Sequence, residues 1–174
     1  MHALRHWLGR PSVALAFAIL YITSQIMIGR ILHGGDAAPL LFQFQFSYSA
    51  AAFQELLNSI NAAQLQALQQ HFVIDHIHPL WYSVLAFSLT AWLLNLNQLS
   101  ARWNLALYPA FVLGLADVLE NHIHEPWFQL QAAPSDPWVL IAGTAATLKW
   151  SLAVLYLLGA LTLAVRYRVR IKGR

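Results

Sequence analysis

Five ionisable residues lie inside or at the edge of segments that are apolar enough to cross a membrane. They are three carboxylic acids and two bases: Asp75, Asp117, Glu120, Arg30 and Lys149. A charged side chain is unfavourable in hydrocarbon, so residues of this kind usually pair with one another or serve a function. Nearly all of them fall toward the same side of the membrane, so the sequence predicts one polar layer that holds the candidate site.

Two helical faces combine these acids with histidine and amide side chains. His71, Asp75 and His78 are separated by four and three residues, so they share one face of a helix. Tyr82 follows one turn after His78. A second face with the same spacing begins at residue 117 and carries Asp117, Glu120, Asn121 and His124.

Two interpretations of the polar layer need only these side chains. The acids and bases could form buried ion pairs that fix the register of the helices. Alternatively, clustered carboxylates repel one another in a medium of low dielectric constant, so one of them would hold a proton and could act in acid–base chemistry. We expect Asp117 and Glu120 to form the acid–base pair and Asp75 to be a further acid. The residues expected to bind or position a ligand are Arg30, His78, Tyr82, Asn121, His124 and Lys149.

A metal centre is a third interpretation. Asp75 and His78 from one helix, with Glu120 and His124 from another, are similar to the carboxylate and histidine stripes of helix-bundle metal sites. Only two helices supply such ligands, however, and Lys149 adds a positive charge at a similar depth. Haem is disfavoured because the acids would oppose an anionic porphyrin. We therefore expect neither a metal nor another cofactor.

The elements that position the layer are predicted to be membrane helices. Of the 174 residues, 59% are hydrophobic and 10% are charged, against roughly 25% charged in an average soluble domain. Four segments approach the ~20 apolar residues that cross a bilayer. They cover about residues 13–32, 72–96, 105–123 and 138–165. The sequence predicts a single membrane domain, an all-α bundle of four transmembrane helices.

Basic residues in the flanks orient this bundle. Five of them follow the last span, whereas the connections after the first and third spans are mainly acidic. The positive-inside rule then places both termini in the cytoplasm and the polar layer in the outer half of the bilayer. We expect the cell membrane, and more narrowly a bacterial inner membrane. The basic tail suits anionic lipids better than nucleic acid, and a membrane protein partner or a second copy of the chain stays open.

An amphipathic helical cap on the outer face is predicted from residues 42–71. Aromatic and polar residues alternate from Phe42 to Tyr48, which indicates a short extended segment. Apolar residues recur with a helical period from Ala50, and Asn61 with Gln64 resembles a capping box. Two prolines, Pro79 and Pro109, fall inside predicted spans and are expected to kink them. A stiff loop is expected from Pro126 to Pro137.

Three short elements resemble a loose group of uncharacterised bacterial membrane proteins with four spans. They are Phe46-Ser47 with Phe53 downstream, Asp75 with Pro79 and Tyr82, and Asp117-x-x-Glu120-Asn121. That group has no established chemistry, so the resemblance implies a fold and singles out positions without assigning roles. A coarser similarity joins the chain to the four-span sterol-isomerase and sigma-2-receptor class, which uses acids in a lipid-accessible cavity; the Asp117-x-x-Glu120-Asn121 element is not shared.

The function expected from these features is a carboxylate-rich pocket that faces the outer leaflet. It would bind a lipid-like or isoprenoid molecule, or act on it by acid–base chemistry. The first alternative is a non-catalytic membrane subunit or a small proton- or ion-coupled carrier whose buried charges are structural. The second alternative is a metal-dependent membrane hydrolase or oxidase.

Overall fold

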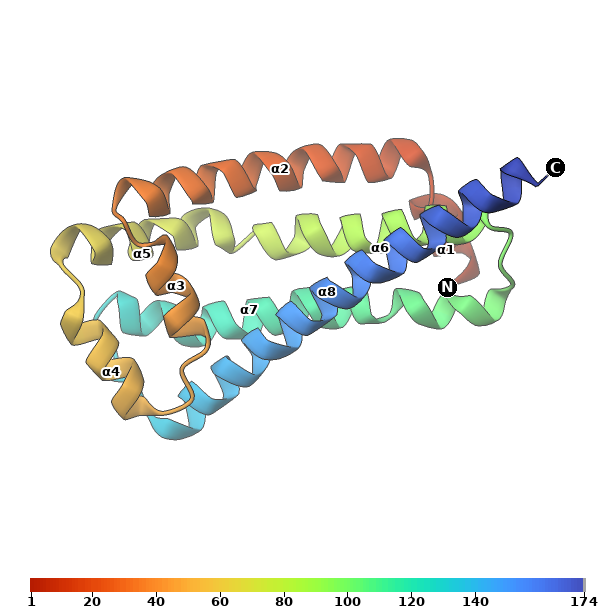
Figure 1. The fold of residues 1–174 in the computed structure, drawn as a ribbon. Coiled ribbons are helices and arrows are strands. Elements are labelled where there is room, and N and C mark those ends of the chain that lie inside the picture. The colour runs from red at the N-terminus through yellow and green to blue at the C-terminus, as the bar shows by residue number, and fades with distance from the viewer. Residues whose placement is uncertain (174) are drawn as a thin grey trace.

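The computed structural model describes residues 1–173, so Arg174 of the basic tail lies outside the described residues. Within this range the chain is helical and forms no strand (Figure 1), which confirms the all-α prediction. The elements are α1 (His2–Leu8), α2 (Pro11–Gly34), α3 (Ala38–Gln45), α4 (Ala50–Ser59), α5 (Ala62–Asp75), α6 (His78–Leu96), the 3₁₀ helix η1 (Ala101–Leu107), α7 (Pro109–Phe128) and α8 (Asp136–Lys172).

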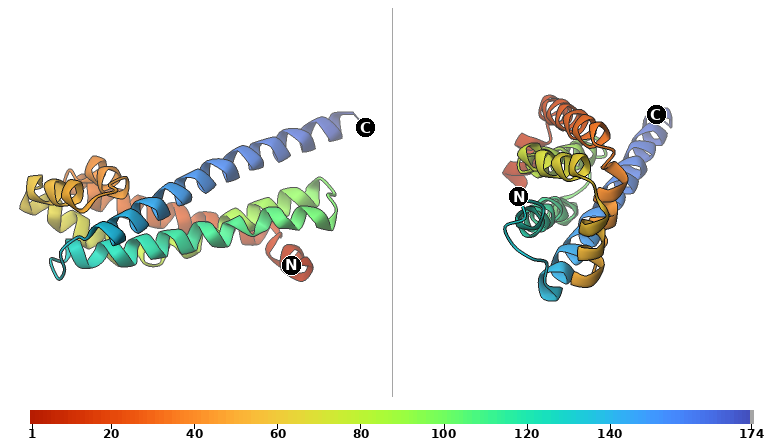
Figure 2. Two further views of the ribbon diagram at one scale, coloured as in Figure 1. Left: turned by 90° about the horizontal axis from the view of Figure 1, so that it is seen from below. Right: turned by 90° about the vertical axis from the view of Figure 1, so that its left-hand side faces the viewer.

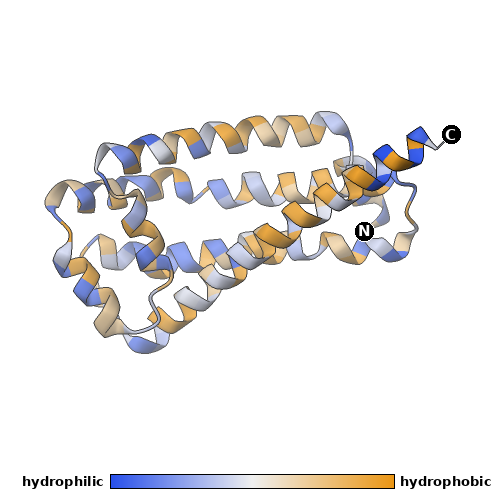
Figure 3. Ribbon diagram, viewed as in Figure 1, coloured by the Kyte–Doolittle hydropathy of each residue, from blue (hydrophilic) through white to orange (hydrophobic). Residues whose placement is uncertain are grey.

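Three helices, α2, α6 and α8, are long and apolar enough to cross a membrane. They run alongside α7, and the two termini lie at the end of the bundle opposite α3, α4 and α5 (Figure 1). Polar residues gather near α3, α4 and α5, whereas the other half of the bundle is mostly apolar up to the basic turns of α8 (Figure 3). The polar layer and the apolar half therefore occupy different levels of the same bundle.

Two prolines stand in the first turn of a helix, so Pro79 marks an interruption of its predicted span and Pro109 kinks no helix. Pro79 stands in the first turn of α6, and the predicted span 72–96 is divided between α5 and α6. Pro109 likewise opens α7 after η1. Proline suits the first turn of a helix because its missing N–H has no partner there. The loop predicted from Pro126 is also too early, because α7 continues through Pro126 to Phe128.

The cap consists of three helices, and the extended segment predicted from Phe42 to Tyr48 is wrong. Residues 38–45 form α3, which buries Phe44 and leaves Phe42 exposed. Alternating aromatic residues fit this helix because Phe44 packs on aromatic rings from two other helices. Its ring centroid lies 4.8 Å from that of Phe53 and 4.8 Å from that of Phe128. These contacts attach α3 to α4 and to the end of α7.

The capping box at the start of α5 is confirmed. The Asn61 side chain accepts a hydrogen bond from the Gln64 N–H at 2.9 Å, and the Gln64 side chain accepts one from the Asn61 N–H at 2.9 Å. The α5 helix then carries His71 and Asp75 to the bundle, where both are buried. The cap therefore supplies part of the polar layer and does not only cover it.

Candidate functional site

Lys149 of α8 lies at the centre of the polar layer. Its Nζ is 2.6 Å from Asp117 Oδ1 and donates a hydrogen bond to it. The hydroxyl of Tyr82 on α6 donates to the other oxygen, Asp117 Oδ2, at 2.7 Å. Asp117 is thus held by one charged and one neutral donor from two different helices. A carboxylate with both oxygens engaged in this way is fixed in orientation.

Glu120 lies beside the same ammonium group but is held less completely. Lys149 Nζ is 2.6 Å from Glu120 Oε2, yet neither carboxylate oxygen makes a hydrogen bond within residues 1–173. The nearest histidine nitrogen, His124 Nδ1, is 3.7 Å from Glu120 Oε1. The carboxylate is 1% exposed. Its contact with Lys149 is therefore an ion pair in an enclosed position.

His71 and Asp75 form a second pair at the end of α5. His71 Nδ1 donates a hydrogen bond to the carbonyl of Leu68. A carbonyl can only accept, so in the neutral ring the other nitrogen, Nε2, carries a lone pair. Nε2 lies 3.8 Å from Asp75 Oδ2, beyond hydrogen-bond distance. Burial lowers the pKa of the His71 imidazole to about 4, so the ring is neutral at neutral pH.

Asn121 compensates for the break between α5 and α6. The carbonyl of Asp75 would normally accept from the N–H four residues later, which is position 79, but proline has no N–H. Asn121 Nδ2 on α7 donates to this carbonyl instead, at 3.2 Å. The Asp75 side chain lines the cavity described below, and the residue is 8% exposed. Its carboxylate is therefore placed to interact with a ligand.

His78 is held by α2 and by two tyrosines. Its Nδ1 is 2.7 Å from Ser24 Oγ, and Ser24 Oγ also lies 2.9 Å from the carbonyl of Leu20. The ring is stacked on Tyr21, with 5.3 Å between centroids, and meets the edge of Tyr82 at 5.3 Å. Both rings restrain the orientation of the imidazole. His78 is thus a positioned side chain and not a solvated one.

A cavity of about 560 Å³ joins these groups. It lies between α2, α3, α5, α6, α7 and α8, and along α8 its lining runs from Lys149 to Ala160, about 16 Å at 1.5 Å per residue. The end next to the cap is polar, and the remainder is lined mainly by aliphatic and aromatic side chains. The polar end consists of His71, Asp75, His78, Tyr82, Asp117 and Lys149.

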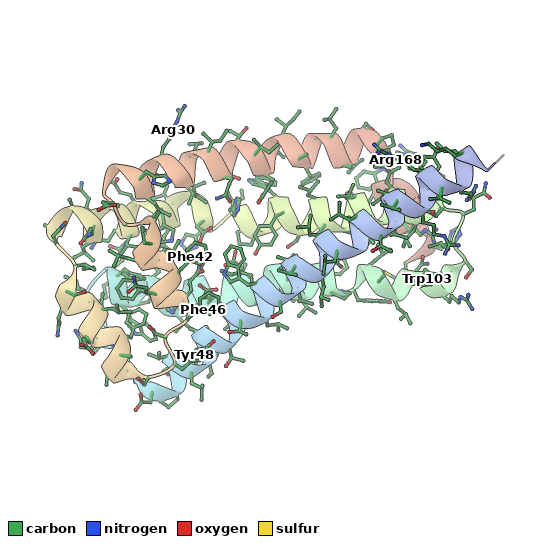
Figure 4. All side chains as sticks on the ribbon, in the orientation of Figure 1. Arg30, Phe42, Phe46, Tyr48, Trp103 and Arg168 are labelled. Atoms are coloured by element: carbon green, nitrogen blue, oxygen red, sulfur yellow. The ribbon has the colours of Figure 1, made fainter. Side chains whose placement is uncertain are left out.

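The structure does not bring all predicted site residues to this cavity. Arg30 is exposed on α2 and points away from the bundle (Figure 4). Of the two predicted bases, Lys149 is therefore the one that contacts the acids. Glu120, Asn121 and His124 are buried behind the lining, although Glu120 touches Lys149. Within residues 1–173, no three histidine or carboxylate groups are placed to hold a metal ion.

Some residues of the cavity lining were not among the predicted site residues. The sequence places His71 on the same helical face as Asp75 without assigning it a role, and the structure adds it to the lining. Gln45 and Trp150 carried no signal in the sequence, because their contact joins α3 to α8 across 105 positions, with Trp150 Nε1 donating to Gln45 Oε1 at 3.0 Å. Only the folded chain reveals that pair.

No family model matches this sequence, and neither a curated protein nor a solved structure is significantly similar to it. The resemblances drawn from short sequence elements are therefore not supported by these comparisons. Function has to be argued from the cavity and its side chains.

Proposed function

We propose that the cavity binds a lipid-like molecule, such as an isoprenoid, within a membrane protein of four spans. The polar end of the ligand would lie near Asp75 and Asp117, and its hydrocarbon part would extend toward Ala160. The observation that carries this proposal is the shape and polarity of the cavity, with acids at one end and a long apolar remainder. Its volume is within the range of about 300–1,000 Å³ that is usual for small-molecule sites.

The placement of α7 supports a fourth span. This helix has 20 residues, which corresponds to about 30 Å, the thickness of a hydrocarbon core. It packs against α6 and α8. Its acids Asp117 and Glu120 are buried toward Lys149, so they need not face lipid. With four crossings both termini share one side, and the positive-inside rule makes that side the cytoplasm and the cap end the outer side.

The polar end favours a ligand head group that donates hydrogen bonds. His71 Nε2 and the carboxylate oxygen Asp75 Oδ2 both accept hydrogen bonds, and they lie 3.8 Å apart. Three acids and one lysine share this layer, so an anionic head group such as a phosphate would add repulsion. A hydroxyl or an amine meets both conditions. An isoprenoid alcohol is therefore a suitable probe.

Acid–base chemistry, if the protein is an enzyme, is best supported at Asp75. Asp117 is engaged by Lys149 and Tyr82, and Glu120 does not line the cavity. Asp75 lines the cavity, and His71 adjoins it. A proton could pass between the ligand and this carboxylate while Lys149 stays in contact with Asp117. We propose Asp75 as the proton-exchanging group and Asp117 as a positioning group.

Native mass spectrometry of detergent-purified protein tests the binding proposal. Gly29 lines the cavity, and a Cβ added there meets no atom within 4 Å, so Gly29→Phe adds a ring at the cavity wall with no clash at its Cβ. Gly159 is exposed and equally open, so Gly159→Phe is the matched control. We expect a bound isoprenoid alcohol in the parent and in the control, and a loss of at least tenfold in Gly29→Phe. Equal binding by both variants would contradict the proposal.

The close contact of Lys149 with two carboxylates favours one second candidate, a non-catalytic subunit or carrier in which these charges lock the helices. Asp117→Asn and Glu120→Gln separate the two. If both variants fold and retain the bound alcohol at the parental level, the ligand proposal loses its polar anchor. If Asp117→Asn alone weakens binding, Asp117 belongs to the ligand site and Glu120 to the framework.

A further inference from the structure

Two neighbouring helices of the cap expose side chains of opposite character. The segment formed by α3 and the turn after it exposes Phe42 (48%), Phe46 (42%) and Tyr48 (46%), which point outward on one flank of the bundle (Figure 4). The next helix, α4, exposes polar residues, including Glu55 and Asn58. A shared aqueous environment does not account for this difference, because three neighbouring aromatic side chains are unfavourable in water.

The contacts of this segment with α8 give its depth. Asp136 Oδ1, at the start of α8, accepts a hydrogen bond from the N–H of Ala50 at 2.6 Å. Tyr48 instead reaches Thr147, with 2.6 Å between the hydroxyl oxygens. Gln45 reaches Trp150, which is about 21 Å along α8 from Asp136. Residues 45–48 thus lie beside the middle of α8, and the chain returns to the start of that helix at Ala50.

The same segment borders a side of the cavity where two long helices do not meet. The helices α2 and α8 do not pack against each other (Figure 2, right). Phe42 and Gln45 of α3 and Trp150 of α8 all line the cavity. The rings of Phe42 and Trp150 are 5.3 Å apart between centroids, and Trp150 is 38% exposed. Only side chains, and no backbone hydrogen bonds, close the cavity here.

We infer that residues 40–48 are immersed in the lipid of the outer leaflet, and that the contact between Phe42 and Trp150 is the opening through which lipid reaches the cavity. Aromatic side chains are typical of the membrane interface, and an irregular turn is tolerated at that depth where it packs against protein. The immersion of the segment stands on exposure and contacts alone. The role of the opening rests on the proposed function.

Spin-label accessibility in phosphatidylcholine vesicles tests the immersion. The chain contains no cysteine, so Phe46→Cys can be labelled alone. Controls are Glu55→Cys on α4 and Leu155→Cys, which is 62% exposed on α8. We expect the label at position 46 to meet oxygen more than a soluble nickel chelate, as at 155, and the label at 55 to show the reverse. Preferred access of the chelate at 46 would overturn the inference, as would exclusion of both reagents, which would indicate a second protein copy.

A reversible cross-link tests the opening. In Phe42→Cys/Trp150→Cys, a cleavable bis-thiosulfonate would join the two sides of the opening. We expect exchange of a fluorescent isoprenoid alcohol between vesicles and protein to slow at least tenfold and to recover when the link is reduced. Unchanged exchange in the linked protein would overturn the opening while leaving the binding proposal intact. If the parent protein binds no alcohol at all, the proposed function fails, and the label at position 46 still decides the immersion.

Discussion

Two buried cations lie at opposite ends of the bundle, and their partners differ. Lys149 and Arg5 are each 7% exposed. Lys149 contacts two carboxylates. Arg5 contacts only neutral oxygens: Nε donates to Asn95 Oδ1 at 2.8 Å, Nη1 to Asn104 Oδ1 at 2.9 Å and Nη2 to the Leu99 carbonyl at 2.9 Å. The first cation faces the cavity and the second does not.

This difference in partners distinguishes a structural contact at Arg5 from a candidate binding site at Lys149. Arg5 ties α1 to α6 through Asn95, to the following connection through the Leu99 carbonyl and to η1 through Asn104. Lys149 could fix α7 to α8 with a single acid. The additional acids Glu120 and Asp75 exceed what a lock requires, and Asp75 faces the cavity. The acids beyond the one that Lys149 needs therefore indicate a ligand site at the Lys149 end of the bundle.

The largest effect is expected at Lys149. Lys149→Met leaves Asp117 and Glu120 buried without a counter-charge, so we expect a loss of about 3–5 kcal/mol in the free energy of unfolding. Thermal unfolding in detergent measures it. Adding Asp117→Asn and Glu120→Gln to the same chain should restore most of the loss, because no uncompensated charge remains. A triple variant as unstable as Lys149→Met would contradict the charge argument.

A smaller effect is expected when His71 is titrated. Burial lowers its pKa from 6.5 to about 4, so the unfolded chain binds a proton that the folded chain does not bind between these values. Stability is therefore complete above about pH 6.5 and falls by up to about 3 kcal/mol as the pH approaches 4. His71→Phe should flatten this part of the pH profile, whereas His122→Phe, at an exposed histidine, should not. An unchanged profile in His71→Phe would rule out this assignment.

The terminal end should respond more modestly and without any effect on the ligand. Arg5→Ala removes hydrogen bonds made by a charged donor, and we expect a loss of about 2 kcal/mol in the free energy of unfolding. Arg5→Lys should recover less than half, because an ammonium group lacks the fork of donors that reaches several oxygens. Binding of an isoprenoid alcohol should be unchanged in the folded protein. Weaker binding would mean that the two ends are coupled, and the comparison would fail.

The smallest change in stability is expected at Asp75, together with a large change in binding. Asp75→Asn keeps the main-chain carbonyl that Asn121 contacts and replaces the carboxylate with a neutral amide of the same shape. Stability should therefore change by less than about 1 kcal/mol. Affinity for the alcohol should fall at least tenfold in a vesicle titration. Parental affinity would show that Asp75 does not contact the ligand.

The sequence predicts the helical bundle and the layer of charged residues well, because hydropathy and helical spacing are local properties. It fails where tertiary contacts decide. Proline lacks an N–H wherever it stands, and only the surroundings of Pro79 and Pro109 determine that these residues start helices. Arg30 lies at a suitable depth but on the outer side of α2, and the low amphipathicity of that helix gives no rule for its rotation. The contact of α3 with α8 joins positions too far apart for a pattern to reveal.

A photoreactive isoprenoid alcohol with a diazirine near the end of its hydrocarbon chain tests the central claim most directly. After illumination in vesicles, we predict cross-links to Leu89, Ala153 and Leu157 in the apolar part of the cavity, removed by an excess of unlabelled alcohol and by Gly29→Phe. A second groove, between α7 and α8 and lined by Leu115, Leu119 and Leu148, serves as the internal control for non-specific labelling. Cross-links confined to that groove and unaffected by Gly29→Phe would contradict the account.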